Sequence, residues 1–162
     1  MKSYVLKDFV KQALIASIYV VLVYVFSFAS FGLIQFRIAE VLMILVLFDK
    51  KSVIGLTLGC FVANLIGGAI LVDVLIGPLA TLLAGILMHM TKKHILLALI
   101  WPAVTNGIII GLILTYGYLL GPVWITMPSV FLGEFAVLYV LGLPIYYALK
   151  NNEGFIEMFQ KN

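Results

Sequence analysis

The chain has 162 residues, of which 64% are hydrophobic and 10% are charged, and its mean hydropathy is +1.21. A soluble domain is about half apolar and about a quarter charged, so this composition excludes an ordinary soluble protein. It indicates a single integral membrane domain over residues 1–162, embedded in the lipid bilayer. The net charge of +3 is small and gives no indication of nucleic-acid binding.

Apolar runs separated by charged residues predict six membrane-spanning helices, each judged against the roughly 20 residues needed to cross. The expected spans are 9–29, 32–48, 52–70, 73–90, 95–119 and 124–149. With a cytoplasmic N-terminus, nine of the ten basic residues fall inside and only Arg37 falls outside, as the positive-inside rule requires. We therefore predict an all-α, multi-pass protein of the plasma membrane with both termini in the cytoplasm.

The second span is unusual because only eight apolar residues separate Glu40 from Asp49. Either its helix begins earlier, with Gln35, Arg37 and Glu40 in its outer half, or the segment 30–40 forms a re-entrant cap. Charged or irregular backbone at membrane depth is tolerated only when it is buried in protein or lines a cavity. Both arrangements place polar side chains near the outer leaflet, facing inward.

Glu134 lies deep in the sixth span, where a carboxylate costs about 2.5–3.5 kcal/mol on insertion scales. An ionisable group at this depth marks a candidate site, and other polar residues accompany it. Arg37 and Glu40, three residues apart, either pair with each other or line a pocket. Asp73 either caps the fourth helix or faces an extracellular opening.

Two asparagines lie near the middle of their spans. Asn64 and Asn106 each have a simple interpretation, which is a hydrogen bond to a neighbouring helix. Asn106 is also a candidate for the pocket, because Pro102 precedes it and can free backbone carbonyls by kinking the helix.

Small residues at four-residue spacing are typical of close helix packing. They are Gly55 with Gly59, Gly107 with Gly111 and, as a ridge on the first span, Ala13 with Ser17.

No catalytic motif is present in the sequence, so we do not expect an enzyme. His89 and His94 are five residues apart across a loop and do not have the spacing of a metal pair, so we expect no metal site. Cys60 has no second cysteine to pair with and is interpreted as a small packed side chain.

On the predicted topology, Gln35, Arg37, Glu40 and Asp73 lie in the outer leaflet, and Asn106 and Glu134 lie near mid-depth. Together they predict an outward-facing polar pocket for a small solute with several hydrogen-bond donors and acceptors. Carriers with alternating access are usually built from two related halves, and this chain has no internal repeat. The sequence therefore indicates a solute-binding protein that needs a partner protein.

Three segments resemble the QueT family, whose members are substrate-binding S components of energy-coupling-factor (ECF) transporters, associated with uptake of queuosine precursors. They are FGLIQFRIAE at 31–40, DVLIGPLATL at 73–82 and WPAVTNG at 101–107. The resemblance implies a six-helix S-component fold and two kinds of partner, a transmembrane coupling protein and two cytoplasmic ATPases that use ATP. It implies no cofactor in this chain.

In this family a ridge of two alanines on the first helix typically contacts the coupling protein, and here the ridge is Ala13 and Ser17. The resemblance further implies that the S component topples in the membrane to deliver its substrate. For a deazaguanine substrate, Glu134 is expected to accept the paired N–H donors and Asn106 to bond the carbonyl or a ring nitrogen. Arg37 and Glu40 are expected to form an outer gate.

The remaining candidates have auxiliary roles. Gln35 is an alternative donor to the substrate carbonyl, and Asp73 or Glu40 would pair the ammonium of an aminomethyl substrate. Two other functions stay open: an S component for a different vitamin or purine-like base, and a stand-alone secondary carrier.

Overall fold

The computed structural model describes residues 2–30 and 35–160, and throughout these ranges the chain forms helices joined by short loops, with no strand. In chain order the elements are α1 (Lys2–Val25), α2 (Ser27–Ser30), the 3₁₀ helix η1 (Ile38–Ile44), α3 (Leu45–Phe48), α4 (Ser52–Ile66), α5 (Leu71–Met90), α6 (Ile95–Tyr116), α7 (Val123–Ala136), the π-helix η2 (Val137–Gly142), α8 (Leu143–Lys150) and α9 (Glu153–Gln160).

Four helical segments of the described chain are long and apolar enough to cross a membrane. They are Leu6–Val25, Leu71–Met90, Ile95–Tyr116 and Val123–Lys150. Ile38–Phe48 and Ser52–Ile66 are apolar but shorter. At about 1.5 Å per residue, the 15 residues of α4 fall short of a bilayer core of about 30 Å. The all-helical fold is confirmed for the described residues, and the count of six spans stays a prediction.

The expected second span, 32–48, is helical only from Ile38. Residues 31–34 lie outside the described part of the chain, and residues 35–37 have no helical structure. The backbone of Gln35 packs directly against Gly133 of α7, where any Cβ would meet the Gln35 carbonyl. Glycine at position 133 therefore lets this non-helical segment cross α7 beside Glu134.

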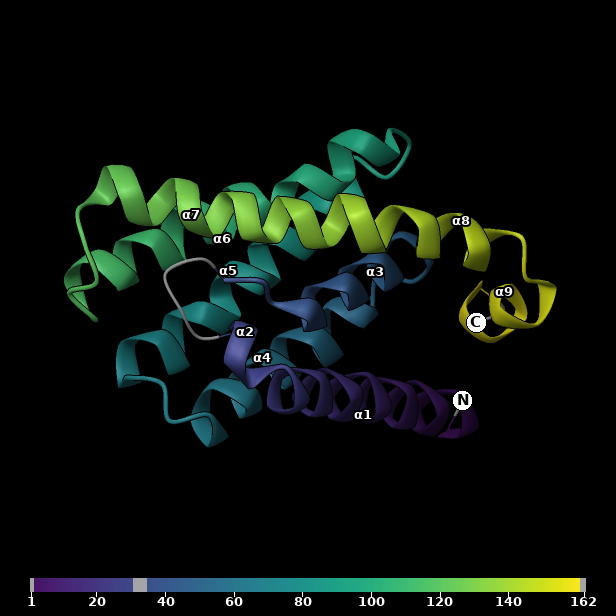
Figure 1. Cartoon of the computed structure of the whole chain (residues 1–162). Helices are drawn as coiled ribbons and strands as arrows, with labels where there is room; N and C mark the ends of the chain where they lie inside the picture. Colours follow the sequence, from purple (N-terminus) through teal and green to yellow (C-terminus); the bar gives the residue numbers. More distant parts are fainter. Residues whose placement is uncertain (1, 31–34, 161–162) are drawn as a thin grey trace.

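Both GxxxG pairs lie at close helix contacts, as predicted. A Cβ on Gly55 or Gly59 would lie 2.7–2.8 Å from atoms of Gln12 or Tyr19, so these glycines let α4 approach α1. A Cβ on Gly111 would lie 2.7 Å from atoms of Met127, where α6 and α7 run side by side. η1 and α3 fill the middle of the bundle, between α1 and the long helix formed by α7, η2 and α8 (Figure 1).

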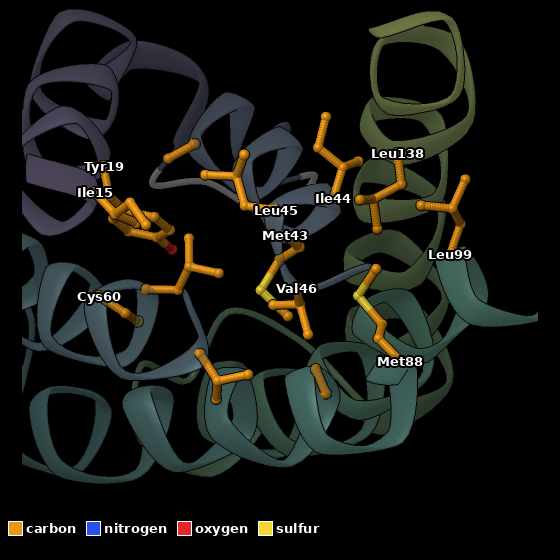
Figure 2. Close-up of a cluster of buried hydrophobic side chains, with 14 of the residues drawn as sticks. Ile15, Tyr19, Met43, Ile44, Leu45, Val46, Cys60, Met88, Leu99 and Leu138 are labelled. Atoms are coloured by element: carbon orange, nitrogen blue, oxygen red, sulfur yellow. The ribbon is translucent and has the colours of Figure 1, made fainter. Parts of the chain in front are cut away.

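The main apolar core is built around this central segment. Met43 and Val46 are fully buried, between Tyr19 on one side and Leu99 and Leu138 on the other (Figure 2). The core thus joins η1 and α3 to helices that are distant in sequence.

The two termini lie at the same end of the molecule (Figure 1). Two ion pairs tie α1 to the α3–α4 connection there: Lys11 with Asp49 at 2.8 Å, and Lys51 with Asp8. The hydrogen bond to Asp8 raises the pKa of the Lys51 ammonium. This basic end is the one that the sequence predicts to be cytoplasmic, and the orientation itself stays a prediction.

Candidate functional site

The polar residues singled out from the sequence are all buried inside the bundle. Their exposed fractions are 0–5%, for Gln35, Arg37, Glu40, Asp73, Asn106 and Glu134. In a chain surrounded by lipid, such groups need partners within the protein.

Glu134 and Asn106 meet where α7 packs on α6. The side-chain amide of Asn106 donates to Oε1 of Glu134 at 3.1 Å. The close approach is possible because Gly107, next to Asn106, has no side chain, and its Cβ would lie 3.0 Å from Phe131. The other carboxylate oxygen of Glu134, Oε2, is buried and has no hydrogen-bond partner among residues 2–30 and 35–160.

Glu40 lies in the first turn of η1 and is bonded from α1. The hydroxyl of Tyr19 donates to its Oε1 at 2.5 Å, while its Oε2 is buried and unpaired. Tyr19 is fully buried, so this bond is shielded from water and lipid.

Arg37 does not pair directly with Glu40 in the described residues, so the first of the two interpretations is wrong. Arg37 precedes η1, and the three-residue spacing therefore does not place the two side chains on one α-helical face. Its guanidinium donates instead to Oδ1 of Asn64, and Nη2 lies 3.7 Å from Sγ of Cys60. Another guanidinium nitrogen, Nε, is buried and has no partner in the described part of the chain.

Asp73 is not the N-cap of α5, because that position belongs to Ile70. Asp73 lies in the first turn, where both of its carboxylate oxygens accept hydrogen bonds. Oδ2 accepts from the hydroxyl of Tyr118 at 3.0 Å, and Oδ1 from the amide of Asn64 at 3.4 Å. Asn64 thus bonds a neighbouring helix, as predicted, and also links Asp73 to Arg37.

These hydrogen-bonded groups form one electrostatic cluster. The charges of Glu40 and Arg37 act on Glu134, and those of Glu40 and Asp73 act on Arg37. Gln35 joins the cluster through its backbone, which lies on Gly133 next to Glu134. We call Arg37, Glu40, Asn106 and Glu134, with Tyr19, Asn64 and Asp73, the polar cluster.

The polar cluster has three buried atoms with unused hydrogen-bonding capacity: two carboxylate oxygens and one guanidinium nitrogen. An unpaired buried polar group costs about 1–3 kcal/mol, and more when it is charged. Glu40 and Glu134 can therefore each accept a further hydrogen bond, and Arg37 can donate one.

The polar cluster is closed to solvent in this structure, whereas the sequence predicted an outward-facing pocket. Cavities lie elsewhere among the described residues, two of them of appreciable size. The smaller cavity has a volume of about 230 Å³ and is lined by residues of α1 and α4, such as Val20 and Ala63. The larger has a volume of about 720 Å³ and is lined by residues of α1 and α9 together with Leu45 of α3. Neither is lined by a residue of the polar cluster, so a ligand reaches that cluster only after the surrounding helices or loops move.

Sequence reasoning missed two hydroxyls of this region. Tyr19 lies within an apolar run and gives no signal, and Tyr118 lies near the end of the predicted span 95–119, where a tyrosine is first taken for an interfacial aromatic residue. In the structure Tyr118 is partly buried and bonds Asp73. A tyrosine near a span end is ambiguous, because its ring and hydroxyl suit an interface and a buried hydrogen bond equally.

The small-residue ridge of α1 faces outward. Ala13 and Ser17 are exposed, and the Ser17 hydroxyl donates to the backbone carbonyl of Ala13 at 2.8 Å. The hydroxyl is therefore satisfied within its own helix, and the ridge can pack against an apolar surface as an alanine pair would.

Two comparisons with known proteins agree. The model of the QueT transporter family matches residues 9–151. A protein of Lactococcus lactis subsp. cremoris (strain MG1363), named "Queuosine precursor transporter QueT", is 40% identical over 77 residues. That match covers 46% of this chain and 45% of the relative, so it spans less than half the relative's length. No solved structure matches the chain.

Proposed function

Because the chain belongs to the QueT transporter family, we propose that it is the substrate-binding S component of an ECF importer for a deazaguanine precursor of queuosine. The observation that carries the proposal is the set of unpaired buried atoms on Glu40, Glu134 and Arg37. The name of the Lactococcus relative supports the same substrate class.

Glu134 is the proposed anchor of the substrate. A deazaguanine presents a ring N–H and an exocyclic amine side by side, and a carboxylate can accept both. Oε2 of Glu134 is unpaired, and Oε1 keeps a second lone pair beside its bond from Asn106. Each charge-assisted hydrogen bond contributes about 1.5–3 kcal/mol, so this contact is expected to dominate affinity.

The substrate carbonyl needs a donor, and two groups of the polar cluster are suitable. Asn106 already lies beside Glu134, and Arg37 has an unpaired Nε–H. The side-chain amide of Gln35 is a further candidate donor, because the Gln35 backbone lies against Gly133, the neighbour of Glu134.

If the substrate carries an aminomethyl group, Glu40 is a better partner for its ammonium than Asp73. Both oxygens of Asp73 already accept hydrogen bonds, whereas Oε2 of Glu40 accepts none. Glu40 would then bind the substrate directly while Tyr19 holds its other oxygen.

The energy for uptake comes, in this proposal, from partner subunits. The sequence has no phosphate-binding glycine loop, so ATP would be hydrolysed by two cytoplasmic ATPases acting through a transmembrane coupling protein. The exposed Ala13–Ser17 ridge is the proposed contact with that coupling protein. With the termini in the cytoplasm, the protein would topple to carry its closed site from the outer to the inner face.

Two alternatives make different predictions. An S component for a vitamin or another purine-like base would bind that compound and not a deazaguanine. A stand-alone secondary carrier would accumulate solute in liposomes under an ion gradient with no ATPase present.

The test is calorimetric titration of the purified full chain with deazaguanine, its aminomethyl form, guanine and a panel of vitamins. We expect saturable binding of at least one deazaguanine, with no heat from vitamins. Binding of a vitamin alone would contradict the proposed substrate, and gradient-driven uptake by the protein alone would contradict the S-component role.

A further inference from the structure

Two loops at the end opposite the termini are joined by one tyrosine. They are the α4–α5 connection (67–70) and the α6–α7 connection (117–122), both at the left in Figure 1. The hydroxyl of Tyr118 accepts the backbone N–H of Ile70 at 3.1 Å and donates to Asp73 at 3.0 Å. A single hydroxyl thus holds both the end of one loop and the first turn of α5.

The backbone is shaped to allow this junction. A Cβ on Gly117 would lie 2.7 Å from the carbonyl oxygen of Ile113 and 2.7 Å from Cδ1 of Ile70, so the α6–α7 connection passes close to the α4–α5 connection here. Leu119 has a φ of +55°, a left-handed conformation that is costly for a residue with a side chain. The loop therefore holds a strained turn directly after the tyrosine.

A continuous series of hydrogen bonds runs from this junction to the polar cluster. Tyr118 bonds Oδ2 of Asp73, Asn64 bonds both the backbone carbonyl and Oδ1 of Asp73, and Arg37 donates to Oδ1 of Asn64. Asn64 is fully buried, so its amide has no water to replace either partner. The orientation of the Arg37 guanidinium therefore depends on where Tyr118 holds Asp73.

We propose that Tyr118 is the latch of the site: its hydroxyl holds the two loops together and, through Asp73 and Asn64, positions Arg37 for the substrate. The polar cluster is closed while the latch holds. Substrate enters and leaves when the bonds to Ile70 and Asp73 break. Tyr118 is a positioning residue and does not itself touch substrate.

The inference rests on the proposed function, and its first test measures how fast bound deazaguanine dissociates. Tyr118→Phe keeps the ring and removes both hydrogen bonds. We expect the dissociation rate constant of the deazaguanine to rise about tenfold, and the thermal midpoint of the unliganded protein to fall as well, because buried Asp73 loses a donor. Tyr116→Phe is the matched control, because Tyr116 is two residues earlier and 72% exposed, and it should leave the rate unchanged.

A double-mutant cycle separates positioning from a general structural effect. If Tyr118 acts through Asp73, Tyr118→Phe should change dissociation little once Asp73→Ala has removed the acceptor. Additive effects of the two substitutions, or a dissociation rate for Tyr118→Phe within about threefold of the parent protein, would overturn the latch.

Hydrogen exchange tests the latch without any ligand. The amide of Ile70 should exchange slowly in the parent protein and at least about tenfold faster in Tyr118→Phe, with Tyr116→Phe unchanged. An unaltered Ile70 amide would overturn the latch even if the substrate is correctly assigned. Faster exchange in a protein that binds no deazaguanine would keep the latch and reject the proposed substrate.

Discussion

The short 3₁₀ helix η1 contributes to two buried regions that differ in how complete they are. Met43 points into the apolar core, where it is fully buried among side chains of several helices. Glu40, one turn earlier and equally buried, has a single partner, Tyr19, and leaves one oxygen unpaired. The side chains of the apolar core are packed on all sides, whereas the polar cluster contains buried atoms that have no hydrogen-bond partner among the described residues.

The difference indicates which region serves stability and which serves binding. Burial of a Met or Leu side chain contributes about 1.5–3 kcal/mol to folding. An unpaired polar group works against folding by about 1–3 kcal/mol. The three unpaired atoms on Glu40, Glu134 and Arg37 are the groups that the proposed substrate would satisfy, and substitutions in the two regions should therefore separate folding from affinity.

Truncation in the apolar core should have the largest effect on stability. Met43→Ala is expected to reduce the free energy of unfolding by about 2–5 kcal/mol, because it leaves a cavity at the centre of the bundle. Chemical unfolding in detergent micelles measures the loss, and calorimetry on the folded fraction should show the affinity within about threefold of the parent. The volume-conserving Met43→Leu should cost less than about 1.5 kcal/mol. A large loss of affinity in Met43→Leu would mean that the two regions are not separable.

Tyr19 belongs to both regions, so removing its hydroxyl tests whether stability and affinity can be changed separately. The ring packs in the apolar core and the hydroxyl bonds Glu40. Tyr19→Phe should reduce the free energy of unfolding by about 1–3 kcal/mol, because Glu40 loses its donor while the packing is kept. The affinity for the deazaguanine should also fall, because the Glu40 carboxylate is no longer held in place. A lower free energy of unfolding with an unchanged affinity would show that Glu40 is not part of the binding site.

The exposed ridge of α1 should affect neither folding nor binding. Ser17→Ala is expected to change the unfolding free energy by less than about 0.5 kcal/mol, because the hydroxyl only bonds its own helix. Ser17→Trp should keep substrate binding and abolish ATP-driven uptake in liposomes that contain the coupling protein and ATPases. Leu132→Trp, at an exposed position of α7, is the control. Normal uptake by Ser17→Trp would exclude the ridge as the partner contact.

Much of the candidate site could be predicted from the sequence because polar residues are rare within apolar spans. Glu134, Asn106, Arg37 and Asp73 are conspicuous on that ground alone, and the structure buries all of them. The pairing of Glu134 with Asn106 could not be predicted, since it depends on close contact of α6 and α7 at Gly107.

The expected second span shows that the spacing of residues along the chain does not by itself predict which side chains pair. A three-residue spacing pairs Arg37 with Glu40 only if both lie on one helix, and the helix begins after Arg37, at Ile38. The π-helix η2 was also unforeseen. It precedes Pro144, whose missing N–H leaves a carbonyl one turn earlier without its usual bond, and such an effect depends on the neighbouring packing.

The measurement that tests the account most directly is the affinity of Glu134→Gln for the deazaguanine, taken by calorimetry beside Glu153→Gln, in which an exposed carboxylate of α9 receives the same change. Glutamine can still bond Asn106, so the fold should be kept, but it has only one acceptor oxygen for two donors. We expect affinity about ten- to a hundredfold weaker in Glu134→Gln and unchanged in Glu153→Gln. An affinity for Glu134→Gln within about threefold of the parent protein would contradict the central claim that the unpaired oxygen of Glu134 receives the substrate.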